Sequence, residues 1–269
     1  MATRWQGWAG RLLALICGIP ALGLANGAFA NCFPIAGLPS GAVPAAYQSA
    51  ALPAADSVRI TFLGHSSFLI ETPDGATAIT DYNGMIPTSV TPDFVTMNNA
   101  HETHYTHVVD PAVKFVLRGW DPEGGMAMHD ETHLDLRVRN IPTNVREFGG
   151  TRYNGNSIFV FEVADLCVAH LGHLHHTLTD VHLGEIGIID VLLVPVDGAY
   201  TMAQELMVQV IEQIGPAIVI PMHYFNPSTL ARFLNLLGDR YERVFSEEPT
   251  VTLSRKTLPY RKVLVLPGG

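Results

Sequence analysis

Residues 166–176 read LCVAHLGHLHH, and this stretch places an apolar run typical of a buried strand directly before a histidine-rich loop. The loop holds four of the twelve histidines in the chain. Imidazole is the commonest protein ligand for zinc and similar metals, so histidines at the end of a strand indicate a metal site. The alternative interpretation is a solvated histidine-rich turn that binds metal only incidentally.

Two further histidine-bearing segments also follow predicted strands. They read NAHETH at residues 99–104 and PMHY at residues 221–224. Three loops that meet at one edge of a sheet form the usual geometry of a binding or catalytic site. The three segments together therefore favour a metal site over an incidental histidine-rich turn.

Residues 1–30 have the pattern of a secretory signal peptide. Two arginines precede an apolar stretch at residues 12–24, and Ala28-Phe29-Ala30 follows as a cleavage signal. A glycine and a proline break the apolar stretch, which favours cleavage over an uncleaved membrane anchor. We therefore expect an exported protein, periplasmic or secreted, with no membrane span in the mature chain.

The charge balance narrows the range of partners. The chain has 16 Lys and Arg against 25 Asp and Glu, a formal net charge of −9. Such a surface repels phosphate backbones, so we expect a small-molecule substrate and no nucleic acid. Two cysteines, Cys32 and Cys167, remain after the signal peptide. In an oxidising compartment they are able to pair, but Cys167 lies in an apolar strand, which favours a buried unpaired thiol.

The first half of the mature chain has the alternation and turns of β-hairpins. Residues 31–55 are rich in Ala, Pro and Gly and indicate an extended lead-in. Five strands are predicted after it, at residues 58–63, 68–70, 76–80, 156–163 and 166–170. The third of these strands ends at Asp81.

The second half alternates buried strands with helices. Residues 188–196, apart from Asp190, and residues 217–222 are apolar runs, which suit strands buried on both faces. Thr201 and Gln204 form a capping-box pattern for a helix that ends at Gly215. Its predicted apolar face contains Met202, Leu206, Met207, Val210, Ile211 and Ile214. A second helix begins at Asn226-Pro227, directs Leu230, Phe233, Leu234 and Leu237 inward, and ends at Gly238. Hairpins followed by a β-α-β unit predict an α/β (α+β) fold with sheets covered by helices.

Seven short segments add a family resemblance. They are GHSSF at 64–68, Asp81, the loop at 99–104, NGNS at 154–157, HLG at 170–172, VPVDG at 194–198 and IPMHY at 220–224. In this order they resemble the metallo-β-lactamase superfamily, in particular its ascorbate-6-phosphate-lactonase-like branch of metal-dependent hydrolases. The resemblance implies a four-layer αββα sandwich over residues 56–269, after the signal peptide (1–30) and the extended segment (31–55).

The resemblance also implies a ligand set, and this chain departs from it. The family motif H-x-H-x-D-H falls on Asn99, His101, Thr103 and His104. The next ligand falls on Asn144, the aspartate that bridges two metals falls on His173, and the last histidine is kept as His223. His176 matches a histidine of related sequences, whereas His175 stands where glycine is usual.

These substitutions predict a single metal ion. Two divalent ions about 3.5–4 Å apart need anionic bridging groups to offset their repulsion, and both aspartates are missing. His101, His104, His173 and His223 are therefore expected to bind one ion together. Nitrogen ligands favour zinc, our first choice, with Fe²⁺, Ni²⁺ or Cu²⁺ as alternatives.

Several other residues are candidates for lining or supporting this site. Asp81 is expected to hydrogen-bond a ligand histidine or the backbone, and His65 to be a turn residue more than an orienting group. Glu102 is a candidate general base, but solvent exposure is the favoured interpretation. The full supporting set is His65, Asp81, Asn99, Thr103, Asn144, His170 and His176.

Two functions follow from this site. The first is an exported metal-dependent hydrolase of a small ester, lactone or phosphodiester that uses metal-activated water. The second is a catalytically silent binding or scaffold protein with a structural metal or none, because catalytic zinc usually has three protein ligands and an open position. Thr103 in place of the motif aspartate favours the second function, and the histidines at 170–176 favour the first.

Overall fold

The computed structural model describes Met1, Cys32 and residues 56–86, 90–98 and 101–267. The expected signal peptide beyond Met1, the lead-in beyond Cys32, and Asn99 lie outside these residues, so the proposed division of the chain stays a prediction. No helix in the described ranges has both the length and the apolar character needed to cross a membrane.

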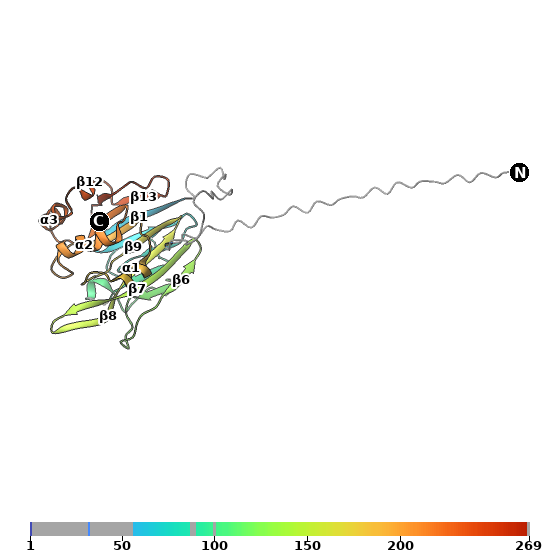
Figure 1. Ribbon diagram of the computed structural model, residues 1–269. Coiled ribbons are helices and arrows are strands. Elements are labelled where there is room, and N and C mark those ends of the chain that lie inside the picture. Colours follow the sequence, from blue (N-terminus) through green and yellow to red (C-terminus); the bar gives the residue numbers. More distant parts are fainter. Residues whose placement is uncertain (2–31, 33–55, 87–89, 99–100, 268–269) are drawn as a thin grey trace.

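Two mixed β-sheets form the centre of the molecule (Figure 1). The six-stranded sheet has the order β13 (Thr250–Ser254), β1 (Ser57–Gly64), β2 (Ser67–Glu71), β3 (Thr77–Ile79), β4 (Phe94–Met97) and β5 (Phe115–Arg118). The eight-stranded sheet has the order β12 (Glu242–Phe245), β14 (Lys262–Val265), β11 (Ile218–Met222), β10 (Val191–Pro195), β9 (Leu166–His170), β8 (Gly150–Val163), β7 (Leu136–Glu147) and β6 (Asp130–His133).

A hydrophobic core lies between the two sheets. Along β1 the buried residues alternate, and Val58, Ile60 and Phe62 point into this core, as a period of two requires. Phe159 and Phe161 of β8 belong to the same core. The predicted strands at residues 58–63 and 156–163 are therefore confirmed.

Three helices, α1 (Asp180–Ile186), α2 (Gln204–Ile214) and α3 (Pro227–Leu237), cover the eight-stranded sheet with a second core. Strand β10 lies between the two cores. Its residues Leu192 and Val194 belong to the helix side, and Val191 and Leu193 belong to the side between the sheets. This double burial explains why residues 191–196 are all apolar; the strand begins at Val191, after Asp190, and not at the predicted residue 188.

Helix α3 has the ends expected from its sequence. The side chain of Asn226 accepts a hydrogen bond from Thr229 N, and Gly238 follows the last helical residue with φ 62°. Phe233, Leu234 and Leu237 are buried as predicted.

The capping box predicted for α2 is wrong. The helix begins at Gln204 after Ala203, and no side chain caps it. The Thr201 hydroxyl donates to Asp197 instead, and the Gln204 amide donates to the carbonyl of Val196. Leu206 is also 40% exposed, so it is not part of the buried face, which instead includes Met207, Val208, Val210 and Ile211.

The outer face of the six-stranded sheet carries a smaller core of Val95, Met97, Val113 and Trp120. Among the described residues, this face has only the short 3₁₀ helix η1 (Glu102–His104) and loops over it; η2 (Gly238–Arg240) follows α3 at the other side of the molecule. The α/β sandwich is confirmed, with a thin fourth layer.

Cys32 and Cys167 form a disulfide, with Cα atoms 5.9 Å apart, which corrects the expectation of an unpaired buried thiol. Both residues are buried in the core under the helices, and the carbonyl of Cys32 accepts a hydrogen bond from Ile188 N. The apolar surroundings of Cys167 therefore also contain its disulfide partner, Cys32, which is 135 residues away in the sequence.

Candidate metal centre

The two sheets present their strand ends at one shared edge. Strands β9, β10 and β11 run parallel, so the loops after them leave the same side of the eight-stranded sheet. Strands β3 and β4 are also parallel, and Asp81 and η1 follow them. Because ligands bind outside the carboxyl ends of parallel strands, this edge is the expected place for a site.

Four histidines from three of these loops come together. The ring nitrogens of His101, His104, His173 and His223 lie within 4.8 Å of one another, and we call these four residues the histidine tetrad. His104, His173 and His223 are buried, whereas His101 is exposed. The structure thus brings together the four residues predicted as ligands; that they bind a metal stays a prediction.

The ring contacts inside the tetrad join Nε2 atoms. His101 Nε2 lies 3.1 Å from His173 Nε2, and His104 Nε2 lies 3.2 Å from His223 Nε2. Four nitrogens around one zinc ion, each at about 2.0–2.1 Å in a tetrahedron, would lie about 3.3–3.4 Å apart. These two spacings are therefore close to those of a tetrahedral nitrogen site.

The Nδ1 atoms of the tetrad face outward to separate partners. His104 Nδ1 donates to Asp81 Oδ2 at 2.9 Å, and His223 Nδ1 donates to Asp197 Oδ1 at 3.0 Å. His173 Nδ1 lies 2.7 Å from His175 Nε2, and His101 Nδ1 lies 2.8 Å from the Thr103 hydroxyl. Such outer partners fix the tautomer and the orientation of metal-binding histidines.

These partners decide where the protons are. An ionised carboxylate only accepts hydrogen bonds, so His104 and His223 each carry a proton on Nδ1 and a lone pair on Nε2. Their Nε2 lone pairs then face each other across 3.2 Å, an arrangement that needs a cation between them. A shared proton satisfies one such pair, whereas one metal ion satisfies all four nitrogens, so the donor set fits a metal.

The buried charges favour the same conclusion. Burial raises the pKa of Asp81, but His170 and His104 outweigh this effect and hold the pKa below its usual value. For Asp197, burial is likewise outweighed by hydrogen bonds from His223 and Thr201, and the pKa is lowered. One divalent cation would balance these two carboxylates.

His173, which is buried, and His101, which is more exposed, both favour the neutral ring. Burial, with a smaller contribution from neighbouring imidazoles, lowers the pKa of His173 to about 2 and that of His101 to about 4. The neutral imidazole is the form that binds metals.

Three site residues adopt left-handed backbone conformations, which are uncommon outside glycine. They are His65 (φ 54°), Asp81 (φ 45°) and His223 (φ 54°). The carbonyl of His65 accepts a hydrogen bond from His223 N at 2.7 Å, which links the β1–β2 turn to the end of β11. Strained backbone of this kind clusters at functional sites.

Two other predicted supporting residues use their rings elsewhere. His170 contacts the carbonyl of Ser66 through Nε2 and accepts from Gly172 N through Nδ1. His176 accepts from Asn144 N through Nε2, and its Nδ1 contacts the carbonyl of Thr177. We call His170 and His176 the tethered pair, because both nitrogens of each ring have a protein partner.

Of the remaining candidates, Thr103 and His65 lie next to the tetrad, whereas Asn144 lies next to His176. Asn144 accepts from Asn154 N and lies with His176. Thr103 contacts His101 and, at 3.2 Å, His65 Nε2, so His65 is both a turn residue and a neighbour of the tetrad. Glu102 is exposed, as the favoured interpretation expected.

Two functional contacts were missed in the sequence. Asp197 and His175 each face the Nδ1 of a tetrad member. Asp197 follows a buried strand, as Asp81 does, and this shared position could have predicted that Asp197 also contacts a tetrad histidine.

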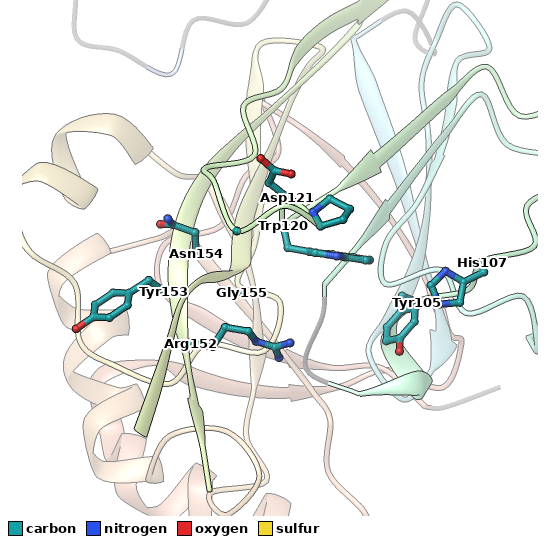
Figure 2. A pocket seen from close by; sticks show the side chains of 10 residues that line it. Tyr105, His107, Trp120, Asp121, Arg152, Tyr153, Asn154 and Gly155 are labelled. Atoms are coloured by element: carbon teal, nitrogen blue, oxygen red, sulfur yellow. The ribbon is translucent and has the colours of Figure 1, made fainter. Parts of the chain in front are cut away.

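Two cavities lie beside this region. One, of about 370 Å³, is lined by His65, His101, Thr103, Tyr200 and Phe225, and we call it the mouth. The second, of about 390 Å³, includes Tyr105, Trp120 and Arg152 in its lining (Figure 2). Arg152 extends from β8 toward the side of the second cavity that carries Trp120 and Tyr105. Only the mouth is lined by a tetrad residue.

Comparisons with known proteins agree with this architecture. Residues 59–223, more than half of the chain, match the family model described as the beta-lactamase superfamily domain. A UPF0173 metal-dependent hydrolase of Salinibacter ruber is 27% identical over 229 residues, which cover 72% of this chain and 99% of the relative.

Solved structures give the same result. A candidate Zn-dependent hydrolase of the metallo-β-lactamase superfamily from Thermotoga maritima is 32% identical, with a TM-score of 0.57, and the match covers 78% of this chain and 98% of that one. A metallo hydrolase from Ignicoccus hospitalis, 21% identical with a TM-score of 0.53, covers 74% of this chain and 99% of its own, and shares the fold.

Proposed function

Because the chain belongs to the metallo-β-lactamase superfamily, we propose that it is a hydrolase that works with one divalent metal ion bound by the histidine tetrad. The observation that carries the proposal is the pair of facing Nε2 atoms of His104 and His223, 3.2 Å apart, whose Nδ1 atoms are committed to carboxylates. Zinc is our first choice of ion, because all four donors are imidazole nitrogens.

The substrate is proposed to be a small ester, lactone or phosphodiester. A divalent ion in this position would polarise a carbonyl or phosphoryl oxygen and lower the pKa of water. The chain's own contribution is orientation: Asp81 and Asp197 hold two rings, and three of the four tetrad residues are shielded from bulk water. His101 is the exposed tetrad member and lines the mouth, so substrate would enter from its side.

A single ion is proposed rather than two. Thr103 and Asn144 stand where the family resemblance places metal ligands, and their uncharged side chains supply no anionic bridge for a second ion. The His176 ring accepts a hydrogen bond from Asn144 N at 3.0 Å and so offers no open lone pair on Nε2.

A catalytically silent binding protein is the second candidate. The specific observation in its favour is that four imidazoles converge, which fills the positions of a tetrahedral structural zinc site. Thr103 contacts His101 and His65 where the family motif has an aspartate, and this also favours the second candidate.

Export is proposed for this protein as well. The pattern of residues 1–30 and the disulfide between Cys32 and Cys167 both support an oxidising compartment. N-terminal sequencing of protein from the native host tests this, with a mature chain that starts at Asn31 as the expected result.

Metal-loaded protein, purified without a histidine tag, should be assayed against esters, lactones and phosphodiesters. The hydrolase proposal predicts turnover that disappears after metal removal and returns when zinc is added. One bound metal per chain with no turnover on any of the three substrate classes would favour the silent binding protein.

A further inference from the structure

The mouth of the histidine tetrad is built from aromatic side chains. The rings of Tyr200 and Phe225 meet edge to face with centroids 5.6 Å apart. Phe225 lies 5.2 Å from the ring of His223 and 5.9 Å from that of His65, and Tyr200 lies 6.4 Å from the ring of His101. A ligand that reaches the tetrad through this cavity must therefore pass along the wall that these two rings form.

Both rings are more exposed than apolar packing alone would leave them. Tyr200 is 63% exposed and Phe225 is 58% exposed, although each contacts a tetrad residue. Large aromatic side chains gain most from being covered, because each ring buries a large area. Two exposed rings around a concave cavity of about 370 Å³ form a surface suited to cover by an apolar ligand.

The turn that carries Tyr200 is held in place by the same carboxylate that orients His223. Asp197 Oδ2 accepts hydrogen bonds from the backbone N–H groups of Ala199, Tyr200 and Thr201, and Asp197 Oδ1 accepts from His223 Nδ1. The backbone from which the Tyr200 ring extends is therefore held in place relative to the tetrad, which favours a preorganised binding wall.

Cationic groups are missing from the lining of this cavity. Its five lining residues, all described in the structure, include no lysine and no arginine. Arg146 approaches the same turn, but its guanidinium donates to the carbonyls of Ala199 and Thr201. Phosphate groups are usually recognised by Arg, Lys or helix N-termini, so this lining suits an uncharged ligand better than a phosphodiester.

We propose that Tyr200 and Phe225 select substrates with an uncharged ester or lactone group attached to an apolar, preferably aromatic, ring. This inference rests on the proposed hydrolase function and narrows its substrate class. It assigns the two rings to substrate binding and leaves the tetrad to the reaction itself.

The experiment compares three substrates with zinc-loaded protein. They are dihydrocoumarin (a lactone fused to an aromatic ring), γ-butyrolactone (an aliphatic lactone without an aromatic ring) and bis(4-nitrophenyl) phosphate (an aromatic diester with a negative charge). Rates are divided by the uncatalysed rates to remove differences in reactivity. We expect the aromatic lactone to exceed both others by at least about tenfold in kcat/KM, which is the scale expected for one covered ring.

The variants Tyr200→Ala and Phe225→Ala should each lower the preference for dihydrocoumarin over γ-butyrolactone about tenfold, chiefly through KM. Tyr260→Ala and Phe245→Ala are matched controls, because these rings are 83% and 64% exposed and lie outside the mouth lining. The controls should keep the preference of the parent protein.

Binding without turnover separates this inference from the hydrolase proposal. The lactam analogue of dihydrocoumarin, measured by calorimetry, should bind the zinc-loaded protein more tightly than 2-pyrrolidinone does, and Tyr200→Ala should abolish the difference. Lactam binding with this pattern but without hydrolysis of any substrate would contradict the hydrolase proposal alone. Equal binding of the two lactams, or faster hydrolysis of the phosphodiester, would overturn the aromatic-substrate inference.

Discussion

The histidine tetrad and the tethered pair lie at the same edge of the sandwich but differ in what their ring nitrogens face. In the tetrad each Nδ1 meets an outer partner and each Nε2 points to another tetrad member. In the tethered pair, His170 and His176 direct both nitrogens to protein groups. Nearness in sequence, even within residues 170–176, therefore does not make a histidine a candidate metal ligand; an unclaimed lone pair on the ring does.

The largest effect should come from removing a tetrad ring. His223→Ala or His173→Ala is expected to abolish retained metal, because the variant loses one of the four ligands and leaves its outer partner, the carboxylate of Asp197 or the ring of His175, without the group that it contacts. Elemental analysis after dialysis, with circular dichroism to verify folding, measures this. His176→Ala is the matched control within the same loop and should retain metal. Equal losses from His173→Ala and His176→Ala would contradict the distinction between the tetrad and the tethered pair.

The disulfide offers a change that should affect stability and leave the tetrad intact. Cys32→Ser with Cys167→Ser should lower the free energy of unfolding by about 2–5 kcal/mol, since the bond closes a long loop of chain. Its sulfurs lie in the core under the helices, so metal affinity should stay within about threefold of the parent value. Urea unfolding and zinc titration of the same protein test both parts, and a metal-free double variant would show that the two regions are coupled.

Smaller losses of affinity are expected when an outer partner of the tetrad is changed. Asp81→Asn or Asp197→Asn should weaken zinc binding by about 10–100-fold. An amide both donates and accepts hydrogen bonds, so unlike a carboxylate it does not fix the proton of His104 or His223 on Nδ1. Asp130→Asn is the control, since Asp130 pairs with Arg137 on an exposed part of β6. An unchanged zinc dissociation constant in both Asp81→Asn and Asp197→Asn would contradict the assignment of Nε2 lone pairs of His104 and His223 to the centre of the tetrad.

The local sequence predicted those parts of the fold that depend on neighbouring residues. Helix α3 follows its Asn226 cap and Gly238 stop because both signals act within one turn of the chain. The start of α2 was not predictable in this way. The Thr201 side chain donates to Asp197, and the Gln204 side chain donates to the carbonyls of Val196 and the distant Thr229. The Cys32–Cys167 bond likewise depends on residues brought together by the fold.

The candidate site was predictable to a similar degree. Its four histidines come together because each follows a strand whose end lies at the shared edge. The roles of His175 and Asp197 depend on loop conformation, including the turn in which one Asp197 oxygen accepts three backbone N–H groups. Spacing in the sequence carries no information about such a turn, so these partners emerge only from the structure.

A pH dependence of stability is also expected in the metal-free protein. Burial lowers the pKa of His173 to about 2 and the pKa values of His101 and His65 to about 4, whereas unfolded histidine has a pKa of about 6.5. Between about pH 6.5 and 4 the unfolded chain binds more protons than the folded one, so the free energy of unfolding should fall as the pH falls.

Urea unfolding between pH 8 and pH 5 measures this dependence. His173→Gln should reduce the slope below pH 6.5, and His107→Gln, which changes an exposed residue outside the tetrad, should leave it unchanged. Stability that stays constant or rises toward pH 5 would contradict neutral rings in the tetrad.

The number of metal ions per chain decides whether the tetrad binds one divalent ion. Protein purified without an affinity His-tag, saturated with zinc and dialysed, should contain about one zinc per chain by elemental analysis, with about 2.0–2.1 Å zinc–nitrogen distances in its X-ray absorption spectrum. Two tightly bound ions per chain would contradict the single-ion account, and none would contradict metal binding by the tetrad altogether.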